Sequence, residues 1–286
     1  MERTIQKQVL IPDSSVSIDV YGDPDAPALV MIPGVMADAA AWGAVARRLG
    51  GWPAVVVLNR RGRYPSGPLG DGYTLETEIE DAAAVLREFR DVRTLFGWSY
   101  GGLIALHLAN RTPVPHLIAY EPVMAPFGAQ ALPALRRAHD DADGDASVEV
   151  ALREVTGMGA DQIESLRSQD VVWAELRRLG SPIYAETLAI NEAARPVSLG
   201  AAAARVDLIV GERNRGRAPY GTSFDNVARR IAAAKVHELA GQGHLAHLED
   251  PERLAALIDE LGDRRRRLLT GRADGLPLGP ERSVTT

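Results

Sequence analysis

The sequence predicts an α/β protein with a mostly parallel, doubly wound sheet and a helical insertion. Short runs such as Ala28–Ile32 are apolar throughout, which is typical of parallel strands buried between two layers of helices. Helical patterns alternate with these runs up to Tyr120, as in a doubly wound fold. The alternation stops after Pro122 and resumes at Val206. We therefore expect one sheet domain that is interrupted by a separate helical segment.

Each expected element rests on a local pattern. Strands are expected at the apolar or alternating runs of residues 16–21, 28–32, 54–58, 92–96, 117–120, 206–211 and 236–239. Helices are expected at residues 39–49, 76–89, 103–109, 223–234 and 251–267. Residues 124–199 show helical patterns and no convincing strand. The expected organisation is a core of residues 1–123 and 200–268, a helical cap of residues 124–199, and a disordered tail of residues 269–286.

Composition and charge exclude several classes of function. The chain has 286 residues and a formal net charge of −6, which does not favour a nucleic-acid partner, because phosphate binding needs clustered positive charge. It contains no cysteine, so disulfides, thiolate nucleophiles and zinc–thiolate sites are ruled out. It shows neither a secretory signal nor an apolar run of about 20 residues, so we expect a cytoplasmic protein with no membrane partner. The oligomeric state stays open, and a homo-oligomer is one option.

The motif that carries chemistry is Gly97-Trp98-Ser99-Tyr100-Gly101, which fits G-x-S-x-G. It follows an apolar run and opens a helical pattern, which is the setting that a nucleophile elbow requires. Glycines two residues before and after the serine remove Cβ atoms that would clash in so tight a turn. The alternative is a Gly-rich turn between a strand and a helix that binds phosphate.

A serine nucleophile needs a base that removes its proton, and the sequence offers six histidines. His244 lies in a Gly-rich loop between the last expected strand and the terminal helix, where side chains reach a site at the strand ends. The other candidates lie within helices, next to or inside strands, or in the insertion, at positions 107, 116, 139 and 237. His247 forms an H-x-x-H pair with His244, but a third metal ligand is missing. We therefore expect a structural or pocket-lining role for His247 and no metal site.

These features together resemble the α/β-hydrolase family over nearly the whole chain. The segment PGVM at residues 33–36 resembles the family's oxyanion loop, with proline in place of the common histidine. Residues 59–66 resemble its D-x-R-G-x-G-x-S segment, with Asn59 in place of aspartate, and residues 243–252 resemble its catalytic-histidine loop. The resemblance implies the α/β-hydrolase fold, a cap at residues 124–199, and an oxyanion hole formed by the N–H groups of Val35 and Tyr100. It implies no metal and no organic cofactor.

The acid of the implied triad is harder to identify than the serine and the histidine, because the family usually places an aspartate where this chain has Asn214. An asparagine can hold a tautomer but cannot stabilise an imidazolium by charge. Haloalkane dehalogenases and fungal zearalenone lactonases of this family carry the acid directly before the insertion instead. Residues 118–122 and 222–226 resemble segments of these lactonases, whereas Ser99 argues against dehalogenases, which use an aspartate nucleophile. The resemblance therefore implies Glu121 as the acid.

Alternatives to this assignment remain. Asn214 or Glu212 could orient the imidazole, and Glu121 could instead bind backbone amides at the start of the next helix. We expect an oxygen of Glu121 within about 2.6–3.2 Å of His244 Nδ1 if the assignment holds.

The implied function is a serine hydrolase that cleaves a carboxylic ester or lactone of a hydrophobic small molecule through an acyl-enzyme. Apolar residues near the loops are candidates for the substrate pocket, although each taken singly is more typical of a core. The candidates are Gly34, Met36, Trp98, Met124, Phe127, Met158, Trp173 and Tyr184. Two alternatives keep the fold: a lyase, cyclase or acyltransferase, and a ligand-binding pseudoenzyme, which the asparagine at position 214 motivates.

Overall fold

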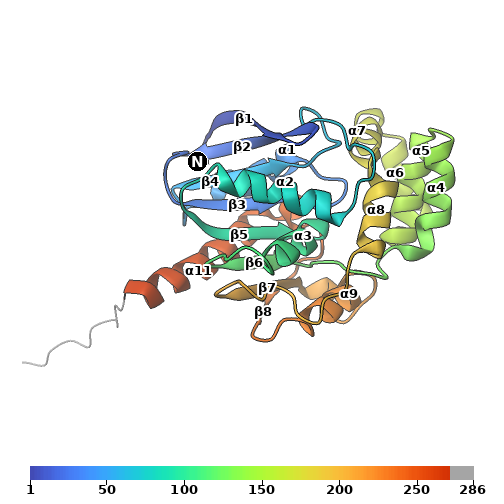
Figure 1. Ribbon diagram of the computed structural model, residues 1–286. Helices are drawn as coiled ribbons and strands as arrows, with labels where there is room; N and C mark the ends of the chain where they lie inside the picture. The colour runs from blue at the N-terminus through green and yellow to red at the C-terminus, as the bar shows by residue number, and fades with distance from the viewer. Residues whose placement is uncertain (271–286) are drawn as a thin grey trace, which may run out of the picture.

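The computed structural model describes the backbone of residues 1–270 and their side chains except those of residues 4 and 263–270. These residues form an eight-stranded sheet in the order β1-β2-β4-β3-β5-β6-β7-β8, in which β3 to β8 are parallel and β1 and β2 antiparallel (Figure 1). The strands are β1 (Arg3–Ile11), β2 (Ser14–Gly22), β3 (Ala28–Ile32), β4 (Ala54–Asn59), β5 (Val92–Trp98), β6 (Leu117–Tyr120), β7 (Val206–Gly211) and β8 (Lys235–Leu239). The predicted mostly parallel sheet is confirmed.

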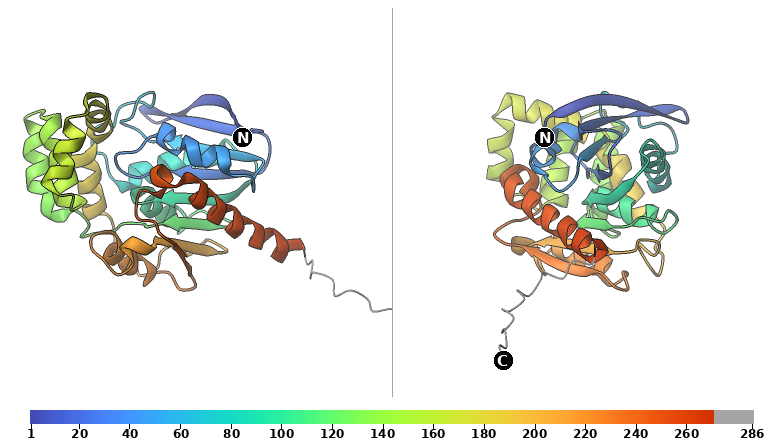
Figure 2. Two further views of the ribbon diagram at one scale, coloured as in Figure 1. Left: turned by 180° about the vertical axis from the view of Figure 1, so that it is seen from behind. Right: turned by 90° about the vertical axis from the view of Figure 1, so that its left-hand side faces the viewer.

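Helices cover both faces of the sheet, because the apolar strands send alternate side chains to each face. Val30 and Val56 face α2 (Leu75–Arg87), α3 (Tyr100–Leu108) and α9 (Tyr220–Ala228) in one core cluster. Met31 and Val57 face α1 (Ala39–Arg48) and α11 (Pro251–Thr270) in the other. The two layers are visible on opposite sides of the sheet in Figures 1 and 2. This two-sided burial explains why the strands read as continuous apolar runs.

The N-terminal strand and one helix differ from the sequence prediction. β1 was not expected, because this edge strand has exposed residues such as Lys7 and Leu10 and buries Val9 and Ile11 only on its inner face. The helix expected at residues 223–234 is instead α9, which begins at Tyr220 and ends at Ala228. It ends early because the chain must turn back before β8 begins at Lys235.

The chain between β6 and β7 forms helices and no strand, and this segment of residues 124–199 lies beyond one end of the sheet (Figure 1). It contains a 3₁₀ turn (Ala129–Ala131), α4 (Leu132–Asp140), α5 (Gly144–Val150), a π-helical turn (Ala151–Val155), α6 (Ala160–Arg167), α7 (Asp170–Gly180) and α8 (Ile183–Glu192). Leu135 and Ile183 belong to one small apolar cluster in this segment, and Leu152 and Trp173 belong to another. The helical segment therefore has buried contacts of its own.

The C-terminal helix is longer than the sequence suggests. α11 continues to Thr270, so it includes the first two residues that were assigned to the tail, and residues 271–286 of that prediction lie outside the described part of the chain. None of the helices described up to residue 270 combines the length and the apolarity that crossing a bilayer requires.

Candidate active site

Ser99 lies in a tight turn between β5 and α3, at the edge of the sheet that faces the helical segment. Its backbone has φ 55° and ψ −121°, a conformation that a non-glycine residue adopts only when its surroundings enforce it. A Cβ atom on Gly97 would lie 2.3 Å from the carbonyl oxygen of Gly101, and one on Gly101 would lie 2.0 Å from that of Ile32. The glycines of the motif are therefore required by close backbone contacts, as the sequence pattern predicts.

His244 is held in the loop between β8 and α10 (Ala246–Glu249) by aromatic residues. The indole N–H of Trp98 donates to the carbonyl oxygen of His244 at 2.9 Å, and the two rings lie 4.8 Å apart. The phenol ring of Tyr220 stacks on the imidazole at 3.7 Å and 15°. Because Trp98 is the chain neighbour of Ser99, these contacts bring the imidazole to the same edge of the sheet as the serine.

Glu121 is fully buried at the end of β6 and accepts hydrogen bonds on both carboxylate oxygens. Its Oε2 lies 2.6 Å from His244 Nδ1, within the distance range expected from the sequence. Its Oε1 accepts the N–H of Gly211 at 2.8 Å. Asn214 Nδ2 donates to both oxygens, at 3.0 and 2.9 Å, so the asparagine contacts the carboxylate. A proton on Nδ1 bonded to Glu121 leaves Nε2 as the basic nitrogen of a neutral imidazole.

Residues flanking the carboxylate also fit this arrangement. Glu121 has a φ of 41°, so the chain bends sharply where β6 leads into the helical segment. Burial and the nearby Glu121 charge raise the pKa of Tyr220, whose phenol therefore stays neutral. The hydroxyl of Tyr120 donates to the carbonyl oxygen of Gly243, which anchors the loop that carries His244.

The loop that resembles an oxyanion loop packs directly on the nucleophile turn. A Cβ atom on Gly34 would lie 2.8 Å from Ser99 Cβ and 2.9 Å from the carbonyl oxygen of Trp98, so only glycine permits this approach. Tyr100 is the first residue of α3, and the N–H groups of a first helical turn have no carbonyl partner within the helix. The N–H groups of Val35 and Tyr100 thus belong to two segments that meet at Ser99.

A buried arginine that sequence analysis missed holds the loop of residues 33–36. Arg60 donates from Nε to the carbonyl oxygen of Pro33 at 2.9 Å and from a terminal nitrogen to that of Gly34 at 2.7 Å. Its guanidinium also pairs with Glu78 on α2 and with Glu186 on α8, each at 2.6 Å. Sequence analysis noted residues 59–66 for their resemblance to a family segment. Nothing in the sequence indicated that this segment contacts α8.

The same network ties the helical segment to the sheet. Arg63 contacts both carboxylate oxygens of Glu186 at 2.8 Å, and the Tyr73 hydroxyl donates to Glu78 at 2.6 Å. Burial opposes ionisation of Glu186, but the two arginines hold its pKa below the usual value. Burial raises the pKa of Glu78 in spite of its contact with Arg60. A fixed charged cluster therefore lies between α8 and the loop of residues 33–36.

The expected pocket residues separate into three groups. Trp98 contacts the imidazole, and Phe127 packs on Tyr220 at 5.6 Å, so both lie close to His244. Met36 contacts both apolar clusters of the helical segment. The remaining residues lie farther within the packing: Met124 in the core beside α3, Met158 and Trp173 in the α5–α7 cluster, and Tyr184 against His139. The Trp173 indole also donates to Asp145 at 2.6 Å, which is a structural role.

The other histidines have structural contacts. The ring of His247 stacks on that of Trp42, with the ring centroids 4.6 Å apart. Burial, and to a lesser extent repulsion from His244, lowers the pKa of His247 to about 3. His247 is therefore a neutral packing residue. His116 and His237 both contact Asp207, each at 2.7 Å. These placements agree with the expectation that His247 is structural or lines a pocket.

Comparisons with known proteins agree with this fold. The Alpha/beta hydrolase family matches residues 29–257. Over 119 residues the chain is 31% identical to the uncharacterized hydrolase YraK of Bacillus subtilis (strain 168), a match that spans 40% of this chain and 43% of that protein.

Two solved structures share the fold at low identity. An alpha/beta hydrolase from Sphaerobacter thermophilus DSM 20745 has a TM-score of 0.70 and 22% identity, with 89% of this chain and 99% of that chain covered. The enol-lactonase from Burkholderia xenovorans LB400 has a TM-score of 0.66 and 20% identity, with 89% and 98% covered. The family match spans most of the chain and agrees with the order of the strands in the sheet, so this protein belongs to the alpha/beta hydrolase family.

Proposed function

We propose that the protein is a serine hydrolase that cleaves a carboxylic ester or lactone of a hydrophobic small molecule, with Ser99, His244 and Glu121 as its triad. The observation that carries the proposal is the 2.6 Å contact between His244 Nδ1 and a buried carboxylate, at the sheet edge where Ser99 occupies a strained turn. This contact supplies what Asn214 alone could not, a negative charge next to the imidazole.

In the proposed reaction, Ser99 Oγ attacks the carbonyl carbon while His244 Nε2 takes the serine proton. Glu121 holds the other proton on Nδ1 and stabilises the imidazolium. The N–H groups of Val35 and Tyr100 would donate to the developing oxyanion, and loss of one such donor typically lowers turnover by about 10²–10³. His244 then protonates the leaving alkoxide, and water, activated by the same imidazole, releases the acyl group from Ser99.

An apolar acyl or lactone substrate fits the residues near the imidazole. Trp98, Tyr220 and Phe127 present aromatic surface there. Because an enol-lactonase has the same fold, lactones belong among the substrates to be tested.

Covalent labelling with a fluorophosphonate tests the proposal, since this reagent reacts only with an activated serine. We expect stoichiometric labelling of the wild-type protein at Ser99 and hydrolysis of p-nitrophenyl butyrate, with both lost in Ser99→Ala. Absence of an adduct at neutral pH would instead support the ligand-binding pseudoenzyme. A Ser99→Ala variant that keeps its activity on a substrate would indicate non-hydrolytic chemistry.

A further inference from the structure

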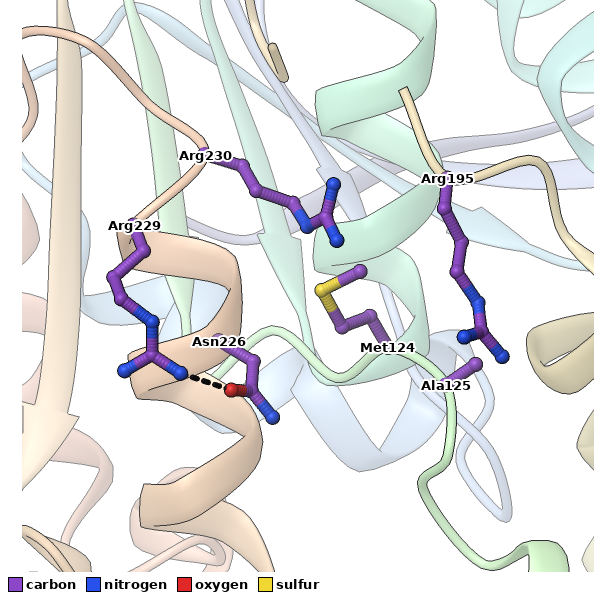
Figure 3. Close-up of a pocket in the computed structure, with 6 residues that line it drawn as sticks. All are labelled: Met124, Ala125, Arg195, Asn226, Arg229 and Arg230. Carbon is purple, nitrogen blue, oxygen red and sulfur yellow. Dashed lines mark hydrogen bonds between the residues drawn. The ribbon is translucent and has the colours of Figure 1, made fainter. Parts of the chain in front are cut away.

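An arginine-lined cavity lies between α9 and the end of the helical segment. It has a volume of about 360 Å³, within the range of small-molecule sites. Figure 3 shows Met124 and Ala125 together with the side chains of Arg195, Arg229 and Arg230 around it. Arg229 and Arg230 follow α9, whereas Arg195 lies between α8 and β7. Two separate stretches of the chain therefore place three cations around one space, which we call the arginine cavity.

The polar side chains of the arginine cavity supply donors. Arg230 is fixed by a hydrogen bond to the carbonyl oxygen of Pro196 at 2.8 Å. Arg229 donates a hydrogen bond to the side-chain oxygen of Asn226 (Figure 3). The amide nitrogen of Asn226 is then the group with which this side chain can bind a ligand. Guanidinium groups carry no acceptor. A ligand here would thus meet hydrogen-bond donors from all four polar side chains.

Among the side chains that the structure describes, no aspartate or glutamate forms an ion pair with Arg195, Arg229 or Arg230. Two other arginines of the β7–α9 connection are paired, Arg213 with Glu249 at 3.1 Å and Arg215 with Glu238 at 3.4 Å. The chain as a whole carries a net charge of −6. Positive charge that no carboxylate of the described residues pairs with is therefore a local departure from the net negative charge of the protein.

We propose that the arginine cavity binds a small molecule that carries oxyanion groups, either phosphates or several carboxylates. Guanidinium groups recognise both through paired, charge-assisted hydrogen bonds. The volume exceeds that of a single inorganic ion, which favours a compact polyanion. Arg195 and Arg229 are exposed and Arg230 is half-buried, so solvent weakens the repulsion between the three cations. A bound anion would neutralise the repulsion that remains.

This site is separate from the proposed catalytic centre, because neither Ser99 nor His244 lines the cavity. It nevertheless touches the segment that carries the acid. Met124 lies three residues after Glu121, and its N–H donates to Ser223 Oγ of α9 at 3.0 Å. A bound anion would therefore link α9, the start of the helical segment and its return to β7.

Isothermal titration of the full-length protein with pyrophosphate and with citrate, at constant ionic strength, tests the proposal. We expect saturable binding of one molecule of at least one probe per chain. Tighter binding of pyrophosphate would identify phosphate as the preferred group, and tighter binding of citrate would identify carboxylates. Arg195→Gln and Arg229→Gln should each weaken binding about tenfold, the usual effect of losing one hydrogen bond to a charged group. Ser99→Ala should bind as the wild-type protein does, which separates this result from the outcome for hydrolysis.

Arg137→Gln is the matched control, because Arg137 is exposed on α4 away from the cavity and the substitution removes the same charge. It should leave the affinity unchanged. Failure of both probes to saturate in the millimolar range, or equal weakening in all three arginine variants, would overturn the proposal. Equal weakening would mean that the probes respond only to overall charge.

Discussion

Replacing Glu121 by glutamine removes one negative charge from the proposed triad and leaves the size of the side chain unchanged. The structure also determines which way the new amide would point. If its nitrogen replaced Oε1, it would face the N–H of Gly211, and two buried donors would oppose each other. If it replaced Oε2, it would face Nδ1 of His244, which can switch from donor to acceptor. We expect the second orientation.

That orientation places the imidazole proton on Nε2, the nitrogen that must accept the serine proton. The substitution therefore removes the base as well as the charge. Two unit charges about 4 Å apart interact with about 4 kcal/mol at an effective dielectric of about 20, which corresponds to a factor of about 10³ in rate. With the unfavourable tautomer added, we expect kcat to fall by about 10³–10⁴.

Initial rates on p-nitrophenyl butyrate measure this loss, with circular dichroism to check that the variant is folded. Asn214→Ala is the control, because it removes donors to the same carboxylate but keeps the charge. It should lower kcat about tenfold or less, as expected for one hydrogen bond to a charged group. A Glu121→Gln variant within tenfold of the wild-type rate, or equal losses in the two variants, would refute the assignment of the acid.

Three further predictions concern the surroundings of the site. Gly34→Ala should lower kcat by at least about tenfold, because its Cβ would displace Ser99 or the oxyanion loop, whereas Gly144→Ala in the helical segment should leave ester hydrolysis unchanged. Glu186→Gln should lower the free energy of unfolding in urea by about 3–5 kcal/mol, since it leaves two buried arginines short of a counter-charge; a loss below about 1 kcal/mol would contradict this. Burial lowers the pKa of His107 to about 4 in the folded protein. As the pH falls through about 6.5, the unfolded chain therefore gains a proton on this histidine and the folded chain does not. The free energy of unfolding consequently decreases between about pH 6.5 and pH 4. By pH 5 this loss is about 2 kcal/mol, and it should be absent in His107→Gln when unfolding is compared at pH 7 and pH 5.

The sequence predicted those parts of the fold whose signals are local. Continuous apolar runs located the buried parallel strands, because burial on both faces leaves no polar positions. The glycines around Ser99 marked the tight turn between β5 and α3, since close backbone contacts exclude any Cβ there. The resemblance of residues 118–122 to segments of related hydrolases, rather than a local signal, implied Glu121, the carboxylate that contacts His244.

Features that depend on contacts between distant segments could not be predicted in this way. The edge strand β1 buries only one face and is paired on only one side, so its pattern is weak. Arg60 and Glu186 are 126 positions apart, and nothing in either local sequence indicates that they meet. Trp173 was a candidate pocket residue, but its side chain packs in an apolar cluster inside the helical segment.

The contact between Asn214 and Glu121 restricts how the acid of such a site could change position during evolution. An aspartate at position 214 would bring a second carboxylate to about the distance now spanned by the amide, 2.9 Å from Glu121 Oε2. Two carboxylates that close cannot both stay ionised, so one would keep a proton and the imidazole would face a shared charge. A lineage could therefore move the acid from β6 to β7 only if the loss of Glu121 accompanied the gain of the aspartate, because an ancestor with both would be impaired.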